Sequence, residues 1–184
     1  MTVVPRHKVF VSFHSEDKHF KDAILEIMEY DFIDQSVGED DIDDSLATET
    51  VRQKIRDEFI RDATVTIVLV GKCTWQRKHV DWEIGSSLRD TKFNSRCGLI
   101  GMLLPGHPDS GSGKFSLSRI PPRLADNISG EDPFAFVLEW STDPNFLRQW
   151  IHHAFLRRYG APPNNSRPQF KRNRSGICSA GWKD

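Results

Sequence analysis

Hydrophobic positions along the chain form two kinds of pattern, compact apolar runs and runs with a spacing of three or four residues. The compact runs predict five strands, at residues 8–13, 31–34, 64–70, 97–104 and 134–138. The spaced runs predict four helices, at residues 15–30, 48–60, 80–88 and 143–158. Because strands and helices alternate along the chain, we expect a parallel sheet with helices on both faces.

This order of elements favours one domain of the α/β class, a flavodoxin-like, doubly wound parallel sheet of five strands. The domain is expected to span residues 1–160. The remaining segment, 161–184, lacks apolar periodicity and is basic, with five cations against a single carboxylate: Arg167, Lys171, Arg172, Arg174, Lys183 and Asp184. Such a composition predicts a disordered basic tail.

Charge and composition exclude several functional classes. The net charge of −1 gives no reason to expect a membrane surface or a specific nucleic acid as partner. The longest apolar window, residues 99–104, is too short to span a bilayer, and the N-terminus does not resemble a signal peptide. Three cysteines without metal-ligand spacing predict free thiols in a reducing compartment, and hence a cytoplasmic protein.

Familiar catalytic and metal-binding motifs are absent from the sequence. No glycine-rich dinucleotide fingerprint follows the first strand, and neither a P-loop nor a G-x-S-x-G elbow occurs. The acidic segment at residues 39–44 lacks the spacing of an EF-hand, so a solvated loop is expected there. His152 and His153 are adjacent and cannot form a zinc pair on one helix face. We therefore predict no metal site and no bound cofactor.

Glu83 is the strongest candidate for chemistry. The apolar strand 64–70 ends at Gly71, and after a short polar crossing the next helix is predicted to begin at Val80. This places Glu83 in the first turn of a helix at the carboxyl edge of the sheet, where open α/β folds bind ligands, with the indole of Trp82 beside it. The alternative is that Glu83 only complements the positive end of the helix.

Four segments, in this order, resemble the TIR domain family over about residues 7–158. Residues 9–17 resemble the first strand and turn of that family, residues 32–36 the segment before its mobile loop, and residues 55–71 a helix and strand. Residues 82–84 lie where TIR enzymes carry their catalytic glutamate, although His79 occupies a position that is often Trp. The turn at residues 12–14 and the segment 120–124 are most similar to the TIR-like proteins of bacterial Thoeris antiphage defence.

The resemblance implies cleavage of NAD⁺ at the nicotinamide–ribose bond, with Glu83 as the catalytic residue. Nicotinamide leaves as a neutral molecule without protonation, so one carboxylate suffices, whereas ordinary glycosidases need two. The substrate-binding candidates are aromatic residues that would wall the nicotinamide and polar residues that would bind ribose or phosphate: Phe10, Phe13, His14, Ser15, Asp34, Ser36 and Trp82. A purely structural role is the alternative for Phe10, Phe13, Trp82, His14 and Ser15, and for Phe10 core packing is the favoured role.

The resemblance also implies that NAD⁺ is a substrate and not a resident cofactor. The expected product is a cyclic ADP-ribose isomer that acts as a signal on a separate effector protein. Whether the chain forms a homo-oligomer is left open. The alternative function is a non-catalytic TIR interaction module. A receiver-like signalling domain fits less well, because it would need an aspartate where the third strand ends in Gly71.

Overall fold

Four parallel strands of four to six residues form the middle of the molecule: β1 (Val9–Ser12), β3 (Val65–Val70), β4 (Gly98–Leu103) and β5 (Phe136–Glu139). A two-residue strand, β2 (Phe32–Ile33), pairs with the outer edge of β1. The strand order is β2-β1-β3-β4-β5, and all these pairings are parallel. This order is compatible with a flavodoxin-like fold, so the α/β prediction is confirmed.

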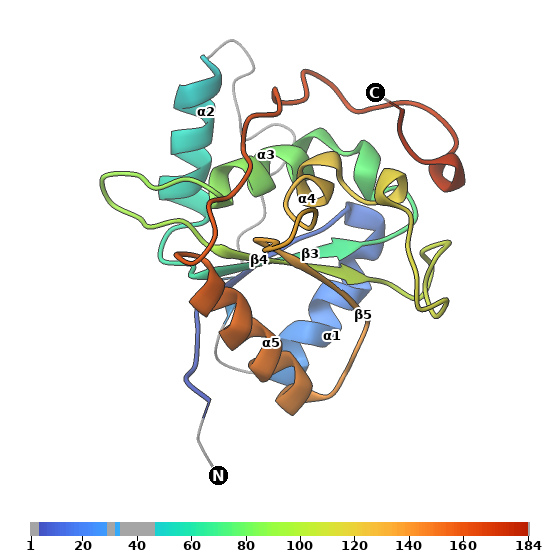
Figure 1. Ribbon diagram of the computed structural model, residues 1–184, viewed down its shortest axis with the longest axis horizontal. Coiled ribbons are helices and arrows are strands. Elements are labelled where there is room, and N and C mark those ends of the chain that lie inside the picture. The colour runs from blue at the N-terminus through green and yellow to red at the C-terminus, as the bar shows by residue number, and fades with distance from the viewer. Residues whose placement is uncertain (1–3, 29–31, 34–46, 184) are drawn as a thin grey trace.

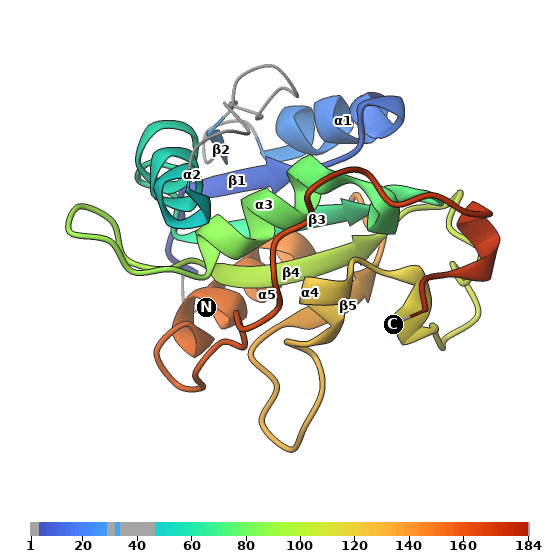
Figure 2. The ribbon, with the colours of Figure 1, turned by 90° about the horizontal axis from the view of Figure 1, so that it is seen from above.

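The computed structural model describes residues 4–28, 32–33 and 47–183 (Figure 1). Two predicted site residues, Asp34 and Ser36, lie outside the described residues, as does the acidic segment 39–44. The helices lie in two layers, one on each face of the sheet (Figures 1 and 2). Among the described residues, no helix has the length and apolar character needed to cross a bilayer.

One layer consists of α1 (Lys18–Met28) and α5 (Pro144–Arg157). The other contains α2 (Thr48–Lys54), α3 (Lys78–Ser87) and the short α4 (Pro122–Ala125). The sequence did not predict α4, because its prolines are typical of a loop, although Pro is also favoured at the first helical position. A π-helical turn, Ile55–Phe59, continues α2, and 3₁₀ turns lie at Ser15–Asp17, Thr74–Gln76, Leu117–Arg119 and Cys178–Ala180.

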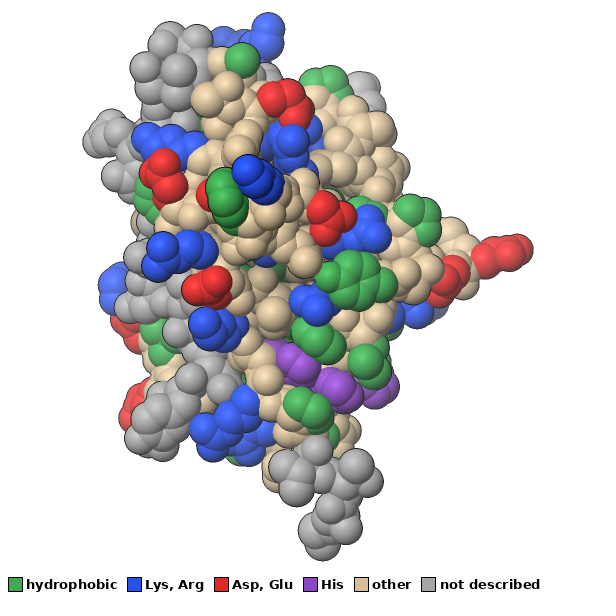
Figure 3. Space-filling model, turned by 90° about the vertical axis from the view of Figure 1, so that its left-hand side faces the viewer, with side chains coloured by type: hydrophobic (Ala, Val, Ile, Leu, Met, Phe, Trp, Pro, Cys, Tyr) green, Lys and Arg blue, Asp and Glu red, His purple; other side chains and the backbone are tan. Residues whose placement is uncertain are grey.

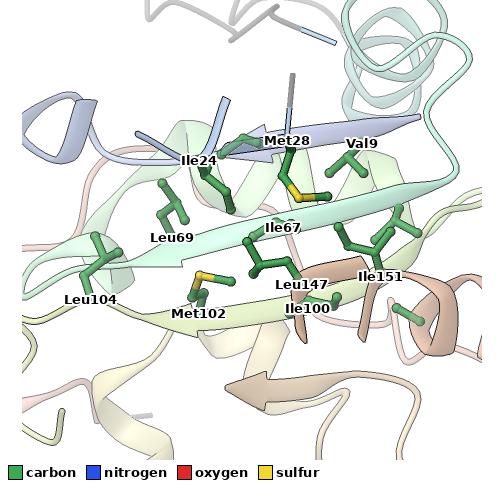
Figure 4. Packing of buried hydrophobic residues seen from close by; sticks show 13 residues of the cluster. Val9, Ile24, Met28, Ile67, Leu69, Ile100, Met102, Leu104, Leu147 and Ile151 are labelled. Atoms are coloured by element: carbon green, nitrogen blue, oxygen red, sulfur yellow. The ribbon is translucent and has the colours of Figure 1, made fainter. Parts of the chain in front are cut away.

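The alternation of side chains along β3 divides the core between the two layers. One set, with Ile67 at its centre, packs against α1 and α5 in the cluster that Figure 4 shows. The other set, including Val68, packs against α3 and α4. A strand that is buried on both faces favours apolar residues throughout, which explains why Thr66 is the one polar residue among the six of β3.

The N-terminal residues before β1 pack against α5. His7 Nε2 lies 2.9 Å from His152 Nδ1, and the His7 ring stacks on Phe155 with 4.2 Å between ring centroids. Figure 3 shows histidine side chains gathered beside hydrophobic ones on this side of the molecule. These contacts hold the start of the sheet to its last helix.

The C-terminal segment, residues 161–183, crosses the helical layer over α3 and ends near the turn at 117–119 (Figure 2). The Trp82 indole donates to Phe170 O at 2.9 Å, and Trp182 N donates to Ser118 O at 2.7 Å. The prediction of a disordered tail is therefore wrong. Side-chain and backbone hydrogen bonds hold an extended segment in place, and such contacts leave no periodic pattern in a sequence.

Cys73 and Cys178 form a disulfide across 105 residues of sequence, with their Cα atoms 4.8 Å apart. The prediction of free thiols is wrong for this pair and holds for Cys97, which is free and buried. The error arose because a pairing over this separation depends on how the C-terminal segment docks. The bond ties that segment to the loop that follows β3.

We predict that the number of reactive thiols will reveal the disulfide. Denatured protein without reductant should show one reactive thiol, from Cys97, and three after reduction. Because closing a long loop restricts the unfolded chain, Cys178→Ser should lower the free energy of unfolding by about 2–4 kcal/mol. A double Cys73→Ser, Cys178→Ser variant should no longer respond to reductant. Three thiols in the unreduced wild-type protein would contradict the pairing.

Candidate active site

Glu83 lies on the side of α3 that faces the sheet, and its side chain is only 1% exposed. The Ser12 hydroxyl, on the last residue of β1, donates to Glu83 Oε2 at 2.5 Å. One turn further along α3, the hydroxyl oxygens of Ser87 and Thr66 are 2.7 Å apart. Polar contacts thus fix α3 to β1 and β3, and a donated hydrogen bond compensates for burial of the Glu83 carboxylate.

The helix begins at Lys78, two residues before the predicted start, so Glu83 lies in the second turn and not in the first. The residues before Val80 extend the helix toward the carboxyl edge of the sheet. His79, in this added turn, has its Nε2 atom 3.0 Å from Phe13 O. The start of α3 is therefore connected to the chain that leaves β1.

Asp17 is a carboxylate near this edge that sequence reasoning missed. A Cβ atom at Gly71, directly after β3, would collide with the Asp17 carboxylate, so Gly71 allows the close approach. Burial raises the pKa of Asp17, and it outweighs the opposing effects of His19 and of a hydrogen bond with the Thr74 side chain. A glycine that ends a central strand was the available signal for this approach.

Two of the residues predicted to bind substrate, Phe10 and Trp82, lie in a hydrophobic cluster with Val51 and Ile55. Phe10 is completely buried there, in line with its alternative packing role. The Trp82 indole donates to Phe170 O, and Lys78 Nζ lies 4.6 Å from its ring centroid. Successive helix positions diverge by about 100°. Thus Trp82 contacts the C-terminal segment whereas Glu83 contacts β1.

The other predicted binding residues follow Ser12 directly. Phe13 is half-buried, with Lys21 Nζ 5.2 Å from its ring centroid. His14 is buried and Ser15 is exposed at the start of a 3₁₀ turn. Their position in the sequence keeps all three near the Ser12–Glu83 contact, and their substrate-binding roles stay predictions.

The opposite side of α3 carries a buried ion pair that sequence reasoning did not identify. Arg123 Nε donates to Asp81 Oδ1 at 3.0 Å, and the two side chains are 0% and 2% exposed. Arg123 belongs to α4 and passes over Gly85, where a Cβ would lie 3.2 Å from its Nε. The segment 120–124 that carries part of the family resemblance therefore contributes to the position of α3.

Within residues 4–28, 32–33 and 47–183, no group of three or more His, Cys, Asp or Glu side chains could hold a metal ion. The functional groups at this edge are the buried carboxylate of Glu83, the hydroxyl of Ser12 that orients it, the imidazole of His79 and the carboxylate of Asp17.

The raised pKa of Asp17 predicts how stability changes with pH. The folded state keeps the Asp17 proton at pH values where the unfolded chain has lost it, so the free energy of unfolding falls as pH rises through this window. The Asp17→Asn variant lacks this titrating group, so its free energy of unfolding should not show this fall. Measured by urea denaturation, the difference in free energy of unfolding between the variant and the wild type should therefore change in favour of the variant from pH 4 to pH 7. Glu26→Gln, at an exposed position, is the control. A relative stability of Asp17→Asn that stays constant or declines would contradict the prediction.

Comparison with protein families confirms the resemblance. A family model, that of the TIR-like domain of Thoeris protein ThsB, matches residues 10–109, a span that contains β3, Glu83, β4 and all of β1 except Val9. Comparison with individual proteins of curated function finds no match. The family model covers more than half of the chain, so this protein belongs to the ThsB TIR-like family of Thoeris proteins.

Proposed function

We propose that this TIR-like domain is an enzyme that cleaves NAD⁺ at the nicotinamide–ribose bond, with Glu83 as its catalytic carboxylate. The observation that supports the proposal best is the Ser12–Glu83 hydrogen bond of 2.5 Å at the carboxyl end of β1. It places an oriented carboxylate at the edge of the sheet where α/β folds bind ligands. Membership of the Thoeris family supports a role in antiphage defence.

The chemistry requires little from the protein beyond a fixed negative charge. When the bond between the ribose carbon and the ring nitrogen breaks, its electron pair leaves with nicotinamide, which becomes neutral. Positive charge then develops on the ribose. A carboxylate already oriented by Ser12 stabilises this charge without reorganising during the reaction. No general acid is needed, in contrast to ordinary glycosidases.

The second step decides the product. A nucleophilic group of the bound ADP-ribose has a high effective concentration at the ribose carbon compared with a water molecule that must be activated. We therefore propose that a cyclic ADP-ribose isomer is the main product and that it acts on a separate effector protein. Aromatic side chains such as Phe13 would help to keep water out.

A second candidate function is a non-catalytic TIR interaction module. The observation that favours it is the 1% exposure of Glu83, whose carboxylate already has Ser12 as a hydrogen-bond partner. In this alternative, Glu83 and Ser12 only join α3 to β1. The two functions differ in whether NAD⁺ is consumed.

Glu83→Gln should reduce NAD⁺ turnover at least about 10²-fold, because it removes a charge that stabilises the transition state. The amide keeps the size of the side chain and can still accept from Ser12, so circular dichroism and melting temperature should change little. Turnover and products are measured by mass spectrometry in extracts from phage-infected cells that express wild type or variant. We expect nicotinamide and a cyclic ADP-ribose isomer from the wild type.

The matched control is Glu58→Gln, the same change at an exposed position, which should retain wild-type turnover. A folded Glu83→Gln protein with near-normal turnover would reject the catalytic assignment. Linear ADP-ribose as the sole product would reject cyclisation and leave NAD⁺ cleavage in place. Extracts with wild-type protein that consume no NAD⁺ beyond extracts without it would favour the interaction module.

A further inference from the structure

A cavity of about 570 Å³ lies between the loop after β3 and the end of the C-terminal segment. Its described lining consists of Trp75 and residues of the C-terminal segment, and it includes neither Glu83 nor Ser12. The volume falls within the range of small-molecule sites. This cavity is therefore separate from the candidate active site.

The lining combines flat aromatic surface with positive charge. Trp75 and Trp182 supply indoles, and Arg172, Arg174 and Lys183 supply cations. The described lining residues include no carboxylate. Such a combination suits a ligand that has both a planar ring and a negative charge.

Hydrogen bonds and the disulfide hold the walls in place. The Trp75 indole donates to Cys178 O at 2.9 Å, next to the disulfide with Cys73. The Gln76 amide donates to Gly176 O at 2.8 Å. The indole of Trp182 donates to Ile120 O at 2.8 Å. Because these contacts join parts of the chain to one another, ligand binding would order little additional chain.

The indole of Trp182 is also positioned by cations. The guanidinium carbon of Arg167 lies 5.3 Å from the Trp182 ring centroid, and that of Arg174 lies 5.9 Å from it. Arg174 also lies 4.7 Å from the ring of Phe170. Two arginines thus support one side of the cavity, whereas Arg172 and Lys183 are exposed at its edge.

We propose that this cavity binds a free nucleotide. Base–aromatic stacking tolerates any base, so an indole supplies affinity without demanding one ring. Guanidinium and ammonium groups bind phosphate oxygens through charge-assisted hydrogen bonds. Arg172 and Lys183 are the phosphate-binding residues, and Trp182 is the stacking residue. This inference does not depend on NAD⁺ cleavage, because the two sites share no residue.

Photolabelling with 8-azido-ADP tests the proposal on the full chain. The label should map by peptide mass spectrometry to residues 172–183 or to Trp75. ADP should compete at least about tenfold more strongly than adenosine, which has the ring and lacks the phosphates. The double variant Arg172→Gln, Lys183→Gln should lose at least about tenfold of the labelling.

The matched control is Arg61→Gln, Lys92→Gln, which removes two exposed cations remote from the cavity lining and should label like the wild type. Label confined to peptides around Glu83 would overturn the proposal. Equal competition by adenosine and ADP, or full labelling of the Arg172→Gln, Lys183→Gln protein, would also overturn it.

Discussion

The buried ion pair between Asp81 and Arg123 is the constraint on which the arrangement around α3 depends. Removing two charges from water costs several kcal/mol per ion, and their attraction compensates only when the remaining donors and acceptors also find partners. Here the C-terminal segment provides them. Phe170 N donates to Asp81 Oδ2 at 2.9 Å, and Arg123 donates to Pro168 O at 3.3 Å and to Asn165 Oδ1 at 2.8 Å. The segment is therefore part of the domain.

This constraint acts on the candidate active site through a single helix. Asp81 and Glu83 are two residues apart on α3, and their side chains contact opposite partners. Asp81 is fixed from outside by Arg123 and the C-terminal segment, whereas Glu83 is fixed from inside by Ser12. A helix held from both sides keeps its carboxylate in one orientation, which preorganised electrostatic catalysis requires.

Periodicity explains which features could be predicted from the sequence. The buried run of β3 and the spacing of apolar residues on α1 and α5 reflect burial on defined faces, and the predicted elements appear there. The candidate Glu83 also followed from its position after a buried strand. The hydrogen bond between Ser12 and Glu83 could not be predicted, because it joins residues 71 positions apart in the sequence.

The C-terminal segment escaped prediction for a physical reason. It is extended, and it is held by pairwise contacts such as those of Phe170 and Trp182 and by the disulfide at Cys178, none of which repeats with a period. Its positive charge suggested a solvated tail, yet Arg167 is paired with Asp126, with a nitrogen–oxygen distance of 2.7 Å. Composition alone does not distinguish a solvated cation from a paired one.

Truncation combined with hydrogen exchange tests most directly whether the C-terminal segment holds α3. Deletion of residues 164–184 leaves the Asp81–Arg123 pair without its outer partners, so we predict faster exchange of the α3 amides. The free energy of unfolding should also fall, by about 1–3 kcal/mol for each buried group of the pair that loses a hydrogen-bond partner. Full-length Cys178→Ser separates the loss of the disulfide from the loss of these hydrogen bonds, and its α3 amides should stay protected. Unchanged α3 exchange and unchanged stability in the truncated protein would contradict the account.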